Sequence, residues 1–378
     1  MIELSESNVQ EYLRAAGKAS STHDLLVQSL TGGIANIVLK VFDPGAGARL
    51  GTDLRSPAQI KRGIPDKRMA AGECMVLKQP LAKFRTQMEW AVDIERTLVE
   101  RDCIDLLTEL LPAGSVPKVL WFDEANYILA ISCAPTDAVI WKKRLLAGHA
   151  CRDAATHAGM LLAMMHSATM NDAAVAKRYG DPKLFIQQRT DAYISATAVK
   201  DADLAELLES ISRQLLEARA CLIHGDYSPK NIFLVPQPPA VPADKPVPFA
   251  LSHLMLLDFE VAFYGHPGFD VATLINHLLL KGFYHGKNWR PFMLAADAFW
   301  QTYSHTAEKS VVNLAGAHAG HILGAIMLAR VDGKSPAEYL TPEMQPIVRA
   351  AARSILAEKD PSLDHALDTI SLSFPAPD

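Results

Sequence analysis

Residues 223–233 read IHGDYSPKNIF. Apolar residues precede and follow a short polar loop, a pattern typical of a loop between two buried strands. Asn231 comes five residues after Asp226, so a loop that folds back can aim both side-chain oxygens into one site. An Asp placed there accepts the proton of a hydroxyl group, and an Asn offers a neutral oxygen to Mg²⁺. The sequence therefore predicts Asp226 as the catalytic base and Asn231 as a metal ligand.

A second polar signal follows at residues 256–260, which read LLDFE. The apolar run 254–257 is typical of a strand, and it ends at Asp258, whose carboxylate suits a hard divalent cation. A surface turn would explain the first motif alone, because short motifs also arise by chance. It does not explain a second carboxylate at the end of the next apolar run. We therefore predict Asp258 as the second metal ligand.

Composition narrows the class of protein. The chain has 378 residues, 49% hydrophobic and 21% charged, which is typical of a globular protein with a large core. A net charge of −5 gives no reason to expect nucleic-acid binding, and no apolar run has the length of a membrane span. The five cysteines form no C-x-x-C pair, so we expect neither a zinc site nor a disulfide framework. With no signal-peptide pattern at the N-terminus, a reducing cytoplasm is the expected location.

The two motifs together resemble those of the aminoglycoside phosphotransferase family, which includes choline kinase and methylthioribose kinase. The family pattern reads His-Gly-Asp, four residues, Asn, and then Asp-Phe-Glu or a near variant, and all of it is present here. Lys78-Gln79 and the stretch 260–270 look most similar to methylthioribose kinase. The resemblance implies an enzyme that transfers the γ-phosphoryl group of ATP, with Mg²⁺, to a hydroxyl of a small molecule.

The resemblance also implies an α+β, two-lobed protein-kinase-like fold. Its small lobe, residues 1–131, would hold the nucleotide on a five-stranded antiparallel sheet. The apolar runs predict those strands at residues 25–30, 37–42, 75–80, 116–122 and 127–131. Residues 132–136 would form the hinge, and residues 137–378 a mainly helical lobe that carries catalysis and binds the acceptor.

The nucleotide contacts are predicted from the small lobe. Lys78 ends an apolar strand, where burying its charge without an anionic partner is costly. The segment 84–102 is helical in pattern, and by its spacing we choose Glu95 as the partner, with Glu89 left open. A Lys held by a helix Glu and pointing at ATP phosphates is the kinase arrangement. A surface lysine is the alternative interpretation.

Two backbone segments complete the predicted nucleotide site. Gly32 and Gly33 form a turn between strands that allows close approach to phosphates, although an ordinary hairpin would look the same. By the resemblance, the hinge backbone at Ser132 and Cys133 would bind the adenine edge. The segments 43–73 and 236–248 are read as inserted loops whose role is open.

The larger lobe is predicted to be helical after residue 137, with late helices at 271–280, 291–305, 311–330, 342–357 and 363–371. The resemblance implies that Asp270 caps a helix and braces the catalytic loop. It also implies that the helices between residues 268 and 330 line the acceptor site. They carry three acidic residues against five Lys or Arg, a thin supply of carboxylates for a polycation.

We therefore expect a neutral or anionic, sugar-like acceptor, with an aminoglycoside or choline-type acceptor as the alternative. His266 and Arg330 are the predicted acceptor contacts, and Arg330 equally fits a role at a helix C-terminus. A non-catalytic nucleotide-binding module is the alternative of another class, but Lys78, Asp226 and both metal residues are all present. The expected partner is a small molecule, neither nucleic acid nor membrane is expected, and a homodimer is left open.

Overall fold

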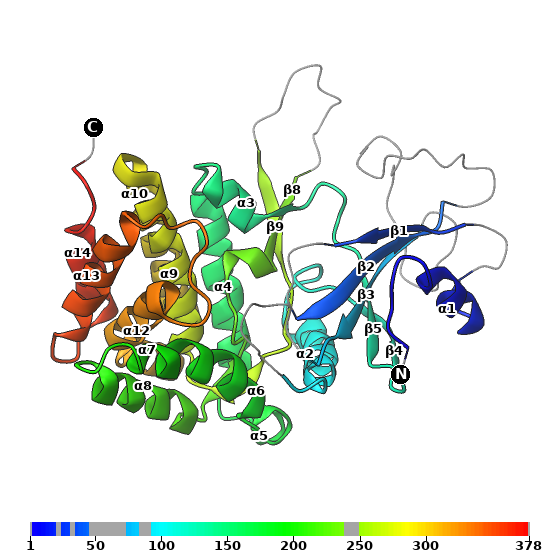
Figure 1. Ribbon diagram of the computed structural model, residues 1–378, viewed down its shortest axis with the longest axis horizontal. Coiled ribbons are helices and arrows are strands. Elements are labelled where there is room, and N and C mark those ends of the chain that lie inside the picture. Colours follow the sequence, from blue (N-terminus) through cyan, green and yellow to red (C-terminus); the bar gives the residue numbers. More distant parts are fainter. Residues whose placement is uncertain are drawn as a thin grey trace, which may run out of the picture. The chain divides into compact units, whose positions relative to one another are not determined.

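The computed structural model describes residues 2–19, 24–30, 35–44, 73–82, 92–237 and 249–376 (Figure 1). The chain divides into two compact units. The first comprises Met1–Glu109 and Val116–Ala138, and the second comprises Leu110–Ser115 and Val139–Asp378. The predicted hinge at 132–136 and the lobe limits stay predictions. Gly32, Gly33, Glu89 and most of the two inserted loops lie outside the described residues.

The first unit contains a five-stranded antiparallel sheet in the order β1-β2-β3-β5-β4. This confirms the strand number and direction expected from the apolar runs. The strands are β1 (Leu26–Ser29), β2 (Asn36–Phe42), β3 (Cys74–Pro80), β4 (Val119–Asp123) and β5 (Ile128–Ser132).

The alternation of side chains gives this sheet two different faces. Leu39 of β2 and Leu77 of β3 are buried with Leu13 of helix α1 (Val9–Ala15) in one apolar cluster. Lys78 is the next residue of β3, so its side chain points to the opposite face, where it meets helix α2 (Arg96–Leu110). Figure 1 shows α1 and α2 on the two sides of the sheet.

Helix α2 lies further along the chain than the apolar pattern predicted. The pattern indicated residues 84–102, whereas the helix runs from Arg96 to Leu110 and residues 83–91 are outside the described part. Cys103, Ile104 and Leu107 form its buried stripe at helical spacing. Glu100 therefore lies one turn into the helix, while Glu95 precedes it.

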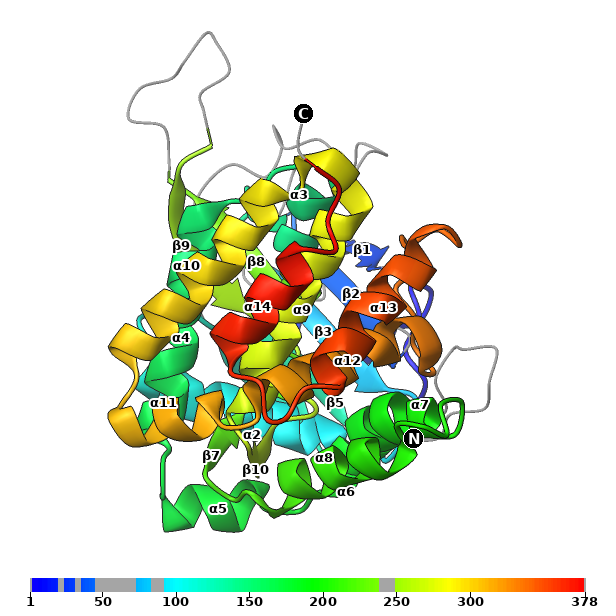
Figure 2. The ribbon, with the colours of Figure 1, turned by 90° about the vertical axis from the view of Figure 1, so that its left-hand side faces the viewer.

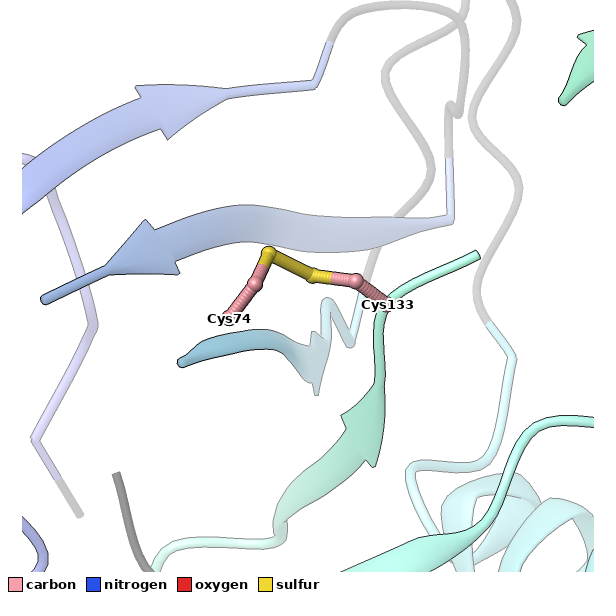
Figure 3. Close-up of a disulfide and its surroundings, with 2 residues drawn as sticks. All are labelled: Cys74 and Cys133. Atoms are coloured by element: carbon pink, nitrogen blue, oxygen red, sulfur yellow. A yellow bond between two sulfur atoms is a disulfide. The ribbon is translucent and has the colours of Figure 1, made fainter. Parts of the chain in front are cut away.

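A disulfide between Cys74 and Cys133 corrects the expectation that the cysteines would be unpaired. The sheet register brings them together: Met75 pairs with Ser132 in the antiparallel ladder, so Cys74 and Cys133 are the next cross-strand neighbours. Their Cα atoms are 5.8 Å apart, within the range that disulfides span. Figure 3 shows the bridge joining the start of β3 to the chain just after β5. A pairing across 59 residues depends on strand register, which cysteine spacing does not reveal.

The second unit places two small sheets around residues 224–231, the predicted catalytic loop. Strand β7 (Cys221–Ile223) precedes the loop and pairs with β10 (Phe263–Gly265). Strand β8 (Ile232–Pro236) follows the loop and pairs with β6 (Val139–Ile140) and β9 (Leu251–Leu256). The predicted apolar runs on both sides of the loop are therefore strands, as expected from their burial.

Helices make up most of the second unit (Figure 2). Helix α4 packs against α10, α9 packs against α10 and α12, and α12 packs against α13 and α14. The helices are α3 (Trp141–Leu146), α4 (Arg152–Ala168), α5 (Ala173–Tyr179), α6 (Lys183–Phe185), η1 (Ile186–Ser195), α7 (Ala196–Ala198), α8 (Ala205–Glu217), η2 (Pro229–Asn231), α9 (Gly268–His285), η3 (Gly286–Asn288), α10 (Arg290–Thr306), α11 (Lys309–Gly316), α12 (Ala319–Asp332), α13 (Met344–Leu356) and α14 (Leu363–Ser371).

Two of these helices differ from the predictions. The segment 311–330 was expected as one helix, but it is divided into α11 and α12 at His318, which adopts a left-handed backbone with φ +56°. Residues 186–195 form a π-helix, in which each turn holds an extra residue. Among the described residues, no single helix has the length and apolar composition to cross a membrane; the bent pair α11 and α12 meets that test jointly.

Candidate active site

The catalytic loop is held from inside by His224. This residue is fully buried and accepts a hydrogen bond at Nδ1 from the backbone N–H of Asp226, at 3.2 Å. The proton is then on Nε2, which donates to the carbonyl of Leu257, at 3.0 Å. Burial lowers the pKa of His224, so the neutral ring that these two bonds require is favoured. His224 thereby ties the loop to the chain just before Asp258.

Asp270, in the first turn of α9, braces the same loop. Its two carboxylate oxygens accept the backbone N–H groups of His224 and Gly225, at 2.6 and 3.0 Å. The predicted bracing role is confirmed, whereas the predicted capping role is wrong, because both oxygens of Asp270 accept from the loop and not from the first N–H groups of α9. Gly225 has φ +73°, and a Cβ there would lie 2.4 Å from the carbonyl oxygen of Val261. The loop therefore requires glycine at this position.

Asp226 lies between two cations. Lys230 Nζ is 2.9 Å and Arg189 Nη2 is 3.1 Å from the same oxygen, Oδ2. Burial alone would raise the pKa of Asp226, but the charges of Lys230 and Arg189 outweigh it and hold the pKa well below its usual range. Within the described part of the chain, Oδ1 has no hydrogen-bond or ion-pair partner. The arrangement keeps the carboxylate ionised and leaves Oδ1 for a hydroxyl donor.

Arg189 is a site residue that the sequence interpretation missed. It comes from the π-helix η1 and is only 7% exposed, and its Nε donates to the carbonyl of Gly225, at 2.5 Å. The contact is made through space, across 36 positions of sequence. The available signal was an Arg on the apolar side of an amphipathic segment, where a charge needs an anionic partner.

Asn231 and Asp258 are placed at the same end of the β8–β9 pair. Ile232 pairs with Leu256, and the N–H of Leu257 donates to the carbonyl of Asn231, at 2.9 Å. Asn231 Nδ2 donates to the backbone carbonyl of Asp226, at 3.0 Å, which leaves its Oδ1 without a partner among the described residues. Asp258 has a left-handed backbone, φ +70°, directly after the strand. An amide oxygen and a carboxylate are the hard oxygen donors that Mg²⁺ takes, so this pair fits the ion.

In the first unit, Lys78 pairs with Glu100 and not with Glu95. Lys78 Nζ lies 2.6 Å from Glu100 Oε1, and the Glu100 side chain is only 2% exposed. Glu95 is exposed and precedes α2. The physical reason is the position of the helix: because α2 begins at Arg96, the side chain that faces β3 comes one turn later than the predicted segment implied.

The predicted hinge residues make contacts within the first unit. Ser132 ends β5; its backbone N–H donates to the carbonyl of Lys118, and its Oγ accepts the N–H of Lys118. Cys133 is in the disulfide with Cys74. Neither contact tests the predicted adenine contacts of Ser132 and Cys133, which stay a prediction.

The two predicted acceptor residues are both buried. The Nδ1 of His266 accepts the N–H of Gly268 at the start of α9, at 3.0 Å, and burial lowers the pKa of His266 to about 4. This contact is structural. Arg330 is 8% exposed, donates to the backbone and hydroxyl of Ser335 just beyond α12, and lies 5.9 Å from the ring of Tyr193. It therefore contacts both the end of its helix and a residue of η1.

Comparisons with known proteins identify the family of the chain. Residues 70–289 match the model of the phosphotransferase enzyme family. Methylthioribose kinase of Yersinia pseudotuberculosis serotype O:1b is 25% identical over 298 residues, which cover 72% of this chain and 63% of the relative. The Pectobacterium atrosepticum enzyme of the same name is 23% identical, with 72% and 64% covered. The chain thus spans slightly less than two thirds of the length of these curated relatives.

Solved structures give weaker similarities. A choline/ethanolamine kinase family protein from Mesorhizobium loti has a TM-score of 0.46 and 11% identity, covering 96% of this chain and 99% of that one. An ethanolamine kinase from Plasmodium vivax has a TM-score of 0.47 and 13% identity, covering 98% and 89%. TM-scores this low establish neither the fold nor the function of this chain. The family match spans more than half of the chain and includes the catalytic loop, Asp258 and Lys78. The chain therefore belongs to the phosphotransferase enzyme family.

Proposed function

We propose that this protein transfers the γ-phosphoryl group of ATP to a hydroxyl of a small, sugar-like acceptor, with Mg²⁺. The observation that carries the proposal is the environment of Asp226: an ionised carboxylate with Oδ1 open, in a loop that also holds Asn231 and runs beside Asp258. The names of the matched relatives, methylthioribose kinases, support a sugar-like acceptor. The proposed architecture is two-lobed and kinase-like, with residues 132–136 as the hinge.

Asp226 acts mainly by orientation. Its Oδ1 accepts the hydrogen bond of the acceptor hydroxyl and aims the oxygen at the γ-phosphorus. Because Lys230 and Arg189 hold its pKa well below the usual range, Asp226 is a weak base while the hydroxyl is intact. The proton moves to it late, as the new O–P bond forms and the bond between the γ-phosphorus and its bridging oxygen breaks. The products are a phosphorylated acceptor and ADP, and the proton passes from Asp226 to solvent.

The other residues of the proposed site position the positive charges that bind the ATP phosphates. Asn231 Oδ1 and the Asp258 carboxylate are the proposed ligands of Mg²⁺, which supplies positive charge to the phosphates. Glu100 fixes Lys78, whose ammonium group is proposed to bind the phosphates from the first unit. Each of these side chains is supported by backbone or side-chain contacts, so its orientation is set before substrates bind.

The alternatives predict different behaviour. An aminoglycoside or choline-type acceptor is cationic, and the two cations on Asp226 disfavour it. A non-catalytic module would bind ATP without turnover. Purified protein should therefore be assayed with Mg²⁺ and ATP against sugars, amino alcohols and aminoglycosides, scored by ADP release and by the mass of the product. We expect release that depends on a sugar-like acceptor. Efficient phosphorylation of an aminoglycoside would overturn the acceptor assignment, and ATP binding without transfer to any acceptor would favour the module.

A further inference from the structure

Two buried cations of the second unit have no acidic partner in the described part of the chain. Lys281, on α9, is 1% exposed; its Nζ lies 3.1 Å from the carbonyl of His277 and 3.2 Å from the Tyr339 hydroxyl. Arg330, on α12, is 8% exposed, and its Nε is buried without a hydrogen-bond partner. We call Lys281 and Arg330 the cation pair. Their direct contacts are neutral oxygens and the rings of Tyr339 and Tyr193. The acidic group that acts on both cations, Glu338, is itself paired with Lys142.

An unbalanced buried charge is expensive, and here the two charges also act on each other. Burial, followed by the charges of Lys142 and Arg330, lowers the pKa of Lys281 well below its usual range. Glu338 opposes this effect only weakly, because its carboxylate forms an ion pair with Lys142. Nothing in the fold explains the placement: a Leu or Met at position 281 would fill the same space without a desolvation cost. Groups held in this way are characteristic of binding sites.

Shared neighbours connect the cation pair to the catalytic carboxylate. The ring of Tyr193 has Arg330 at 5.9 Å and Arg189 at 5.6 Å, and Arg189 contacts Asp226. His277, one turn before Lys281 on α9, gives a second link. After burial, the largest influences on its lowered pKa are Lys281 and Arg330, and the charges of Asp226 and Lys230 also act on it. These shared neighbours place the cation pair in the same part of the second unit as Asp226.

We propose that Lys281 and Arg330 bind a compact anionic group, a carboxylate or a phosphate, carried by the acceptor whose hydroxyl meets Asp226. The inference rests on the proposed function and narrows its acceptor to an anionic hydroxy compound. The anion takes the unpartnered Arg330 Nε–H and the ammonium of Lys281, and it restores the charge balance that the folded chain lacks. Arg189 and Lys230 add positive potential on the same side, which favours an anion and repels a polycation.

Steady-state kinetics test the acceptor. ADP release should be measured with a neutral pentose, the corresponding aldonate and the pentose 5-phosphate. We expect kcat/KM to be at least about 10-fold higher for an anionic member of the set. Lys281→Met should raise the KM of that member by about 10- to 100-fold, the scale of a lost hydrogen bond to a charged group, with the KM of ATP unchanged. Lys281→Arg keeps the positive charge, so its KM for that acceptor should lie between those of wild type and Lys281→Met. Lys309→Met, at an exposed lysine of α11, is the matched control.

Calorimetry gives a readout that needs no turnover. The aldonate and inorganic phosphate are titrated into the full chain with Mg·ADP present, so that contacts to nucleotide phosphates are already made. Wild type and Lys309→Met should bind at least one of the two anions, and Lys281→Met should bind it at least about 10-fold more weakly. Binding of the aldonate alone identifies a carboxylate as the recognised group, and binding of phosphate alone identifies a phosphate. If Lys281→Met does not fold, Arg330→Gln provides the same comparison.

The outcomes separate the two proposals. Equal kcat/KM for neutral and anionic acceptors, unchanged by Lys281→Met, would overturn the anion site and leave the phosphotransferase function intact. Anion binding that depends on Lys281, with no ADP release for any acceptor, would overturn the function and keep the anion site. Anion binding that Lys281→Met and Arg330→Gln both leave unchanged would overturn the anion site by itself.

Discussion

At the scale of single residues, both cations that contact Asp226 bind the same oxygen, Oδ2, and leave Oδ1 for the acceptor hydroxyl. The motif predicted Asp226, Asn231 and Asp258, because their spacing between apolar runs fixes which strand ends they occupy. It did not predict Arg189, which reaches the loop from an element 36 positions earlier. Spacing along the chain determines local geometry, whereas contacts through space depend on how helices pack.

Glu100 and Glu95 offer a matched pair of substitutions. Glu100→Gln removes the charge that holds Lys78 and should weaken ATP binding by about 10-fold, the scale of one hydrogen bond to a charged group. Glu95→Gln, at an exposed position before α2, should change it less than about 2-fold. Titration with a fluorescent ATP analogue measures both. A larger effect at Glu95 than at Glu100 would contradict the assigned ion pair.

The proposed metal ligands differ in charge, and their removal should differ accordingly. Asp258→Ala should abolish the Mg²⁺ dependence of nucleotide binding, because a hard divalent cation needs that carboxylate. Asn231→Ala removes a neutral oxygen and should raise the Mg²⁺ concentration needed for half-maximal nucleotide affinity by about 10-fold. Mg²⁺ titrations monitored by nucleotide affinity show which of the two substitutions weakens Mg²⁺ binding more. Small and equal effects would place the metal elsewhere.

At the scale of elements, helices and strands were predictable where one apolar face repeats. Strand β2 alternates buried and less buried residues, and α8 and α13 have clear apolar stripes. The break between α11 and α12 was not predictable in this way, since apolar residues continue through it. The chain turns there through the left-handed backbone of His318, a conformation that residue type alone does not indicate.

His266, at the start of α9, should make stability depend on pH. Its pKa is about 4 in the folded chain, below the ordinary value near 6.5, so the unfolded chain binds a proton that the folded chain does not. Stability is therefore lost as the pH falls from about 6.5 to 4, by up to about 3 kcal/mol. His266→Asn keeps an acceptor for the Gly268 N–H and should reduce that loss. Urea unfolding at pH 7 and pH 5 measures the loss of unfolding free energy in each protein. An equal loss in wild type and His266→Asn would refute the role of His266 in this pH dependence.

The Cys74–Cys133 bridge should stabilise the sheet of the first unit. It closes a loop of 59 residues between β3 and β5, so its loss should lower the free energy of unfolding by about 2–4 kcal/mol. A Cys74→Ser, Cys133→Ser double variant should show this loss under oxidising conditions, and the difference should vanish when wild type is reduced. Cys151→Ser, at a free and partly exposed cysteine, is the control. Equal stability of oxidised wild type and the double variant would argue against the bridge.

At the scale of the whole molecule, the order of motifs along the chain carried most of the information. Lys78, the catalytic loop and Asp258 appear in the order of the phosphotransferase family, and the family match covers all three. The order of motifs did not predict three features: the disulfide, the partner of Lys78 and the cation pair. Each depends on strand register or helix placement. The acceptor was predicted only as a class, since the contacts that we propose for it come from separate helices.

The central claim is that Asp226 orients the acceptor for phosphoryl transfer from ATP. The most direct measurement is the rate of γ-phosphoryl transfer in wild type and Asp226→Asn, with nucleotide affinity measured on the same samples. We expect Asp226→Asn to turn over at least about 100-fold more slowly, the scale of a lost general base, while it binds Mg·ATP with nearly unchanged affinity. A variant that transfers phosphate at close to the wild-type rate would contradict it.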